Sequence, residues 1–78
     1  MTTYVDHARL RYRGWLMSHL VADSPEELED MARRLELREE WGQGSHYDVT
    51  ESKRAAAIRL GARAVTTRQL IRILRAHR

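Results

Sequence analysis

The stretch that decides the fold of this chain is WLMSHLVADSPEE, residues 15–27. Its first part, Trp15 to Ala22, is an almost continuous apolar run of strand length, which is typical of a strand covered on both faces. Ser24 and Glu27 then supply an N-cap and a capping-box glutamate, with Pro25 in the first helical turn. The stretch therefore predicts a strand that leads into a helix, and the apolar spacing extends this helix to about Arg38.

Short strands and capped helices alternate in the second half of the chain. We expect a strand over 46–49, a helix over 51–60, a strand over 62–65 and a helix that opens at residues 66 and 67. Thr50 is a suitable cap for the first of these helices, and Gly61 is its natural stop. In the last helix, Leu70, Ile71 and Leu74 are expected on one side.

An earlier strand is expected over 4–10, joined to the central one through a turn at Gly14. Strands that alternate with helices are typical of crossover units around a parallel sheet. We therefore predict one α/β domain over residues 1–78, with a small, mainly parallel sheet, about three helices and room for one antiparallel edge strand. An α+β arrangement is the main alternative.

Length and composition exclude several classes of protein. The 78 residues contain no cysteine, which excludes disulfides and thiolate metal sites, and no apolar run approaches the roughly 18 residues of a membrane span. Residues 1–4 lack a signal pattern, so we expect a cytoplasmic protein. A domain this small has a thin core, which leaves a homodimer open.

Charge is unevenly distributed along the chain. The net charge is +3, yet the middle of the chain is acidic and the C-terminal part is basic. Arg68, Arg72 and Arg75 recur at helical spacing in the last helix. Such a stripe either contacts a nucleic-acid backbone or is the solvated face of an amphipathic helix, so a nucleic-acid or regulatory-protein adaptor is one candidate function.

Histidines and aspartates gather near the ends of the expected strands. Strand alternation places His19 with Asp23, and His46 with Asp48, on common faces. Together with Asp6 they either satisfy local hydrogen bonds or line a pocket for a small anionic ligand. A hydrolase with a histidine as general base beside an aspartate is the enzymatic alternative. No standard metal-ligand spacing such as H-E-x-x-H is present, so the sequence predicts neither a specific metal site nor a cofactor.

Other residues could complete this pocket. Lys53 and Arg54 follow the Thr50 cap, where free N–H groups and the helix dipole favour an anion. Trp41 stands before Gly42-Gln43-Gly44 and is a candidate flap over the strand ends, whereas Trp15 is expected in the core because it belongs to the apolar run.

With these residues assembled, the chain resembles a bacterial and phage family of small proteins, the domain of unknown function 4031. The resemblance covers nearly the whole chain and implies no particular activity. The residues that support it are Tyr4-Val5-Asp6, Trp15, His19-Leu20, Ala22-Asp23, Glu27-Leu28, Trp41, His46-Tyr47-Asp48, Lys53-Arg54 and Gly61-Ala62.

The chain also departs from this family pattern at two positions. It has His7 where the family often has a second acid, and Gly42 where the family has a bulkier residue. The first departure argues against a two-carboxylate metal site at residues 6 and 7. The resemblance also implies that the segment His46-Tyr47-Asp48 belongs to the family pattern, which favours a site there.

Overall fold

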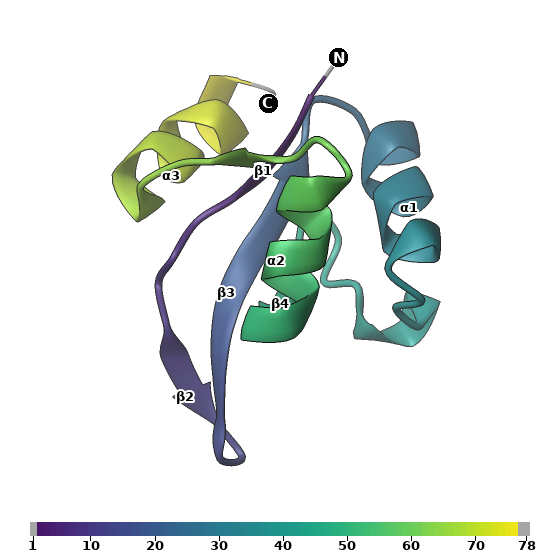
Figure 1. The fold of residues 1–78 in the computed structure, drawn as a ribbon. Helices are drawn as coiled ribbons and strands as arrows, with labels where there is room; N and C mark the ends of the chain where they lie inside the picture. Colours follow the sequence, from purple (N-terminus) through teal and green to yellow (C-terminus); the bar gives the residue numbers. More distant parts are fainter. Residues whose placement is uncertain (1, 77–78) are drawn as a thin grey trace.

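The strand β3 is the centre of the structure, a computed structural model that describes residues 2–76 (Figure 1). Strands and helices alternate irregularly around it, and a 3-10 turn, η1, precedes β4. The elements in chain order are β1 (Thr3–Val5), β2 (Leu10–Tyr12), β3 (Trp15–Ala22), α1 (Pro25–Arg34), η1 (Glu39–Trp41), β4 (Tyr47–Thr50), α2 (Glu51–Arg59), β5 (Arg63–Ala64) and α3 (Thr67–Ala76).

The α/β class and the three helices are confirmed, but the sheet is mixed and mostly antiparallel, so the expected mainly parallel sheet is wrong. Strands β1 and β2 pair antiparallel with β3 along one edge, and β4 pairs antiparallel with its other edge. Only β5 runs parallel to its neighbour, β1. The connection between β2 and β3 is a two-residue turn with positive φ at Arg13 and Gly14, which makes a hairpin and is too short for a crossover, so β2 is antiparallel. Strand β4 also pairs antiparallel with β3, although α1 and η1 lie between them in the chain.

The N-terminal strand expected over 4–10 is interrupted. Strand β1 ends at Val5 and β2 begins at Leu10, and Arg9, in the intervening segment, has a φ of 53°. Both strands pair with the same edge of β3. The backbone therefore leaves the edge of β3 after Val5 and returns to it at Leu10. Asp6 is the first residue of this interruption.

Helix α1 ends earlier than its apolar spacing predicts. Glu36 adopts a φ of 60°, the Leu37 N–H donates to Ala32 O, and the Glu36 N–H donates to Arg33 O. This Schellman pattern stops the helix before Arg38. Gly61, with a φ of 109°, ends α2 in the same manner, as predicted.

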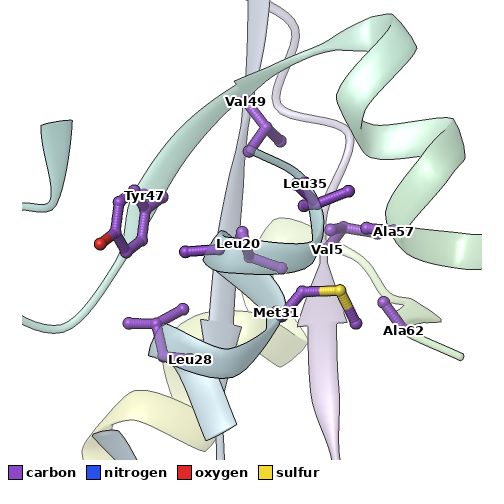
Figure 2. Packing of buried hydrophobic residues seen from close by; sticks show 10 residues of the cluster. Val5, Leu20, Leu28, Met31, Leu35, Tyr47, Val49, Ala57 and Ala62 are labelled. Atoms are coloured by element: carbon purple, nitrogen blue, oxygen red, sulfur yellow. The ribbon is translucent and has the colours of Figure 1, made fainter. Parts of the chain in front are cut away.

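The apolar core lies between the sheet and the helices α1 and α2 (Figure 2). Val5, Leu20 and Val49 from three adjacent strands are almost completely buried there. Figure 1 places α3 on the opposite side of the sheet from these two helices. The core residues labelled in Figure 2 are Val5, Leu20, Leu28, Met31, Leu35, Tyr47, Val49, Ala57 and Ala62.

Helix α3 begins with the predicted cap. The Gln69 N–H donates to Thr66 Oγ1, and Gln69 Oε1 accepts from the Thr66 N–H, which closes a capping box. On the predicted apolar side, Leu70 is buried and Leu74 is half-buried, whereas Ile71 is 42% exposed. Within residues 2–76, no helix is long and apolar enough to pass through a membrane.

Trp15 is 64% exposed, so its predicted place in the core is also wrong. It pairs with Tyr12 beside the turn of the β2–β3 hairpin, and all of β2 is exposed. Figure 1 shows this hairpin extending away from the helices, at the lower end of β3. An apolar strand end becomes buried only where another element covers it, and within residues 2–76 no helix or strand covers Trp15.

Candidate functional site

The interruption of the N-terminal strand positions the side chain of Asp6. The Asp6 N–H still donates to His19 O at 3.1 Å, as a continuing strand would. The His19 N–H, however, donates to Asp6 Oδ1 at 2.8 Å and not to a backbone carbonyl. A carboxylate thus takes the place of a strand partner, and it brings a negative charge to β3.

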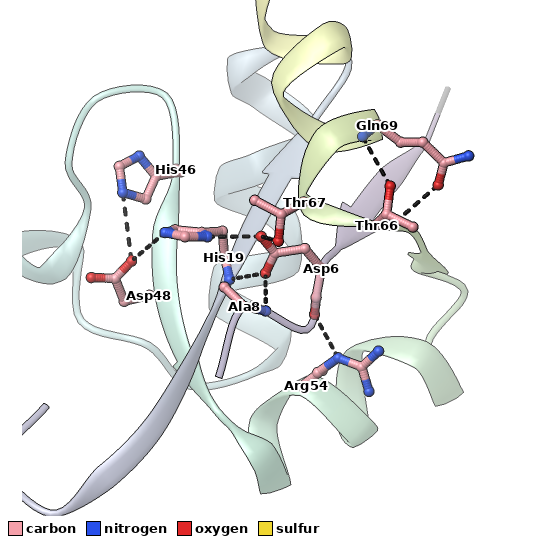
Figure 3. Close-up of polar contacts among 9 residues, drawn as sticks. All are labelled: Asp6, Ala8, His19, His46, Asp48, Arg54, Thr66, Thr67 and Gln69. Atoms are coloured by element: carbon pink, nitrogen blue, oxygen red, sulfur yellow. Dashed lines mark hydrogen bonds and ion pairs between the residues drawn. The ribbon is translucent and has the colours of Figure 1, made fainter. Parts of the chain in front are cut away.

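The Asp6 carboxylate is completely buried and accepts further hydrogen bonds (Figure 3). His19 Nδ1 lies 2.9 Å from Oδ2, Thr67 Oγ1 donates to Oδ2 at 3.0 Å, and the Ala8 N–H donates to Oδ1 at 3.3 Å. Burial raises the pKa of Asp6, but the hydrogen bonds from His19, Ala8 and Thr67 outweigh it and hold the pKa below its ordinary value. Asp6 is therefore a buried, ionised acceptor.

This carboxylate fixes the orientation of the His19 ring. An ionised carboxylate only accepts hydrogen bonds, so Nδ1 is the protonated nitrogen of His19. In the neutral ring, Nε2 then has a free lone pair, and it points away from Asp6 (Figure 3).

Nε2 of His19 faces two further polar side chains from β4 and the loop before it. His19 and Asp48 are direct partners in the β3–β4 register, and Asp48 Oδ1 lies 3.9 Å from His19 Nε2. His46 Nε2 lies 3.5 Å from the same oxygen, and the two imidazole rings meet edge to face with centroids 5.4 Å apart. Three possible ligand atoms of His19, His46 and Asp48 lie within 4.8 Å of one another, and all three residues are half-buried. We call these three residues the HHD cluster.

Asp48 has a supporting partner, Gln43, that no sequence pattern indicated. The Gln43 side-chain amide donates to Asp48 Oδ2 at 3.1 Å, which leaves Oδ1 directed at the histidines. Thr67, the other supporting residue, was expected only to help open a helix. A residue that supports a site through one hydrogen bond leaves no local sequence signal, and only the fold brings it close.

The HHD cluster has the donor set of a metal site. Imidazole nitrogens and a carboxylate oxygen suit zinc and similar divalent ions, and ligand atoms around a zinc ion lie about 3.4 Å apart. The 3.5 and 3.9 Å separations at Asp48 are close to that value. A histidine that binds a metal usually donates its other N–H to a carboxylate or carbonyl, as His19 does to Asp6.

The structure does not bring Asp23 to the HHD cluster. His19 and Asp23 follow the alternation expected of one strand face, but Val21 stands between them. The Asp23 carboxylate accepts instead from the Thr2 N–H and from the Tyr4 hydroxyl, each at 2.9 Å. Asp23 thus ties the N-terminal segment to the end of β3.

Lys53 and Arg54 are bound to backbone oxygens. Lys53 Nζ donates to Leu35 O at 2.6 Å, and Arg54 Nε donates to Asp6 O at 2.7 Å. Thr50 Oγ1 accepts from the Lys53 N–H and so caps α2, as predicted. These two cations hold α2 against neighbouring segments, so their expected role as anion contacts remains a prediction without support from their geometry.

Trp41 ends the 3-10 turn η1 and is 50% exposed. It lines a cleft of about 620 Å³, together with Asp48 and Gln43 from the vicinity of the HHD cluster and with Trp15 from the hairpin. Arg68, Arg72 and Arg75 are exposed along α3 and belong to a separate surface.

A family model described as "Protein of unknown function (DUF4031)" matches residues 3–77. This match confirms the resemblance expected from the sequence. Neither a curated protein nor a solved structure matches the chain.

Proposed function

The chain belongs to the DUF4031 family, and we propose that it binds a divalent transition-metal ion through His19, His46 and Asp48. The observation that supports this function best is the chain of contacts from Asp6 through His19 to the cluster. Asp6 holds the Nδ1 proton of His19, so Nε2 is presented as a ligand toward the other two residues.

A purely structural role explains these distances less well. Hydrogen bonds to a carboxylate usually have heavy-atom separations of about 2.7–3.2 Å. Asp48 Oδ1 lies 3.5 and 3.9 Å from the two imidazole nitrogens, longer than such a bond in both cases. A bound cation would bring all three ligand atoms together and would offset the cost of holding half-buried polar groups at this spacing.

Two nitrogen ligands and one oxygen favour zinc, cobalt, nickel, copper or ferrous iron over magnesium and calcium, which prefer oxygen ligands. Three protein ligands leave at least one coordination position open. We place the small anionic ligand expected from the sequence at this open position. The hydrolase alternative depends on the same position, because a zinc ion lowers the pKa of a bound water to about 7.

Metal binding is tested by titrating the untagged protein with Zn²⁺ and Co²⁺ in a calorimeter. We expect one ion per chain and an intense visible absorption from bound Co²⁺. His46→Ala and Asp48→Asn should each weaken binding at least tenfold, since each removes a ligand. His7→Ala is the matched control, because His7 is exposed and lies outside the HHD cluster. Equal loss in His7→Ala, or unchanged affinity in His46→Ala, would overturn the proposal.

A further inference from the structure

A cleft of about 620 Å³ adjoins the HHD cluster, with which it shares Asp48. One wall is the tip of the β2–β3 hairpin with Tyr12 and Trp15, and the other is the segment around Trp41. This volume is within the range of pockets that hold small organic groups. The cleft is therefore large enough to hold a planar ring system between its two walls.

The aromatic side chains of this cleft are poorly covered by the rest of the chain. Trp15 is 64% exposed, Tyr12 is 60% exposed, and Trp41 is 50% exposed. Tyr12 and Trp15 are direct partners in the hairpin, so their side chains lie on the same face of the sheet. Aromatic side chains left open on two separate walls of one cleft are suited to stack on flat ligands.

Positive charge accompanies these rings. Between Asp6 and Asp23 the chain has no acidic residue. Arg13 lines the cleft and Arg11 lies on β2 of the same hairpin, whereas Arg9 forms an ion pair with Glu51 at 3.4 Å, away from the cleft. The Arg13 guanidinium lies 5.4 Å from the centroid of the Tyr12 ring. On the opposite wall, the Arg38 guanidinium lies 5.6 Å from the Trp41 ring, with Glu40 nearby, so the excess of positive charge lies on the hairpin.

We propose that this cleft binds single-stranded nucleic acid, with bases stacked on Trp15 and Trp41 and with phosphates near the hairpin arginines. Stacking platforms combined with cations are the usual means of holding an unpaired strand, because every base has a flat face and every nucleotide a charge. The arginines favour this polyanion over an apolar peptide or a second copy of the chain. The proposed binding of nucleic acid does not require the metal ion proposed for the HHD cluster. The test below therefore includes EDTA, which removes divalent ions.

The test measures the fluorescence anisotropy of a labelled twelve-nucleotide oligo(dT) with the full chain, in low salt with EDTA. We expect saturable binding that weakens steeply as salt is raised. Trp15→Ala and Trp41→Ala should each weaken binding by about tenfold or more, and Trp15→Phe should restore most of the loss. Because both tryptophans are at least half exposed, these variants should keep the melting temperature of the parent.

Two matched double variants test which surface binds the oligonucleotide. Arg11→Ser with Arg13→Ser removes two charges from the hairpin, and Arg72→Ser with Arg75→Ser removes two from α3. We expect only the hairpin pair to weaken binding. A loss confined to the α3 pair would place nucleic acid on the helix stripe and overturn the proposal. Two other results would also overturn the proposal: unchanged binding of the oligonucleotide in Trp15→Ala, and equal affinity for thymidine monophosphate. A third is a protein that does not bind the oligonucleotide but forms a concentration-dependent dimer, which Trp15→Ala abolishes.

Discussion

Leu20 and His19 are neighbours on β3, but they point to opposite faces of the sheet and are held there in different ways. Leu20 is completely buried between the sheet and helices α1 and α2, among apolar side chains. His19 is half-buried on the other face, where the Asp6 carboxylate orients its ring. Apolar burial tolerates small shifts, whereas the polar face depends on the direction of individual hydrogen bonds. The first face therefore determines stability and the second determines the geometry of the proposed site.

Leu20→Ala should produce the largest effect, a loss of about 2–5 kcal/mol in the free energy of unfolding, because it leaves a cavity in a thin core. Urea unfolding monitored by circular dichroism measures this loss. Leu20→Met keeps most of the volume and should cost less than about 1.5 kcal/mol. A loss below about 1 kcal/mol in Leu20→Ala would contradict the assignment of stability to the helix-covered face.

Stability should also fall at alkaline pH because of Tyr47. Its hydroxyl donates to Glu29, and burial together with this carboxylate raises the pKa of Tyr47 to about 12. Well below pH 10 the Tyr47 hydroxyl is protonated in both the folded and the unfolded chain, so its hydrogen bond contributes fully to the free energy of unfolding. Between pH 10 and 12 the unfolded chain ionises first, and the free energy of unfolding should decrease by up to about 3 kcal/mol.

The measurement is a series of urea unfolding curves from pH 9 to 11.5 for the parent protein and Tyr47→Phe. Other groups titrate in this range, but they do so in both proteins. The decrease should be steeper in the parent than in the variant. Parallel curves would show that the Tyr47 hydroxyl is not protected by the fold.

Asp6→Asn tests the polar face of β3. The amide loses the negative charge and keeps only one oxygen to accept hydrogen bonds, so we expect a loss of about 1–3 kcal/mol in the free energy of unfolding. Because His19 is no longer oriented by a carboxylate, affinity for Zn²⁺ should also fall by about 10–100-fold. Calorimetric titration at a temperature where the variant is folded separates these effects. Thr67→Val removes one hydrogen bond to Asp6 and is the milder control.

His46→Ala should have the smallest effect on the metal-free protein, within about 0.5 kcal/mol, because the side chain is only half-buried and contacts Asp48 and His19, which are half-buried as well. The difference in stability between the parent and His46→Ala should appear only when metal is bound. Zinc at one hundred times its dissociation constant should stabilise the parent by about 2.7 kcal/mol, and His46→Ala by much less. Thermal melts with and without Zn²⁺ check this, and equal shifts in the two proteins would place the ion elsewhere.

Local signals in the sequence predicted much of this architecture. The caps at Ser24, Thr50 and Thr66 and the stop at Gly61 were correct, because each depends on bonds between residues only a few positions apart. The direction of the strands was not predicted correctly. Strand β4 follows α1 yet pairs antiparallel with β3, because a helix between two strands does not by itself determine whether they pair parallel or antiparallel.

The site was predicted in part. The sequence selected Asp6, His19, His46 and Asp48. Strand alternation paired His46 with Asp48, which lie 3.5 Å apart, but it also paired His19 with Asp23, which accepts hydrogen bonds from Thr2 and Tyr4 instead. The sequence could not predict that Asp48 would lie opposite His19, since register depends on the whole pairing of β3 with β4. It also placed Trp15 in the core, because an apolar run indicates which residues prefer burial but not which of them another element covers.

The segment that separates β1 from β2 has a consequence for the order in which the molecule assembles. Asp6 contacts residues 13, 48 and 61 positions away along the chain. Contacts between distant positions require the closure of long loops, so they are slow to form, whereas the two-residue hairpin closes locally. We therefore expect the imidazole of His19 to acquire its final orientation late in folding, after α3 has docked and brought Thr67 to the carboxylate.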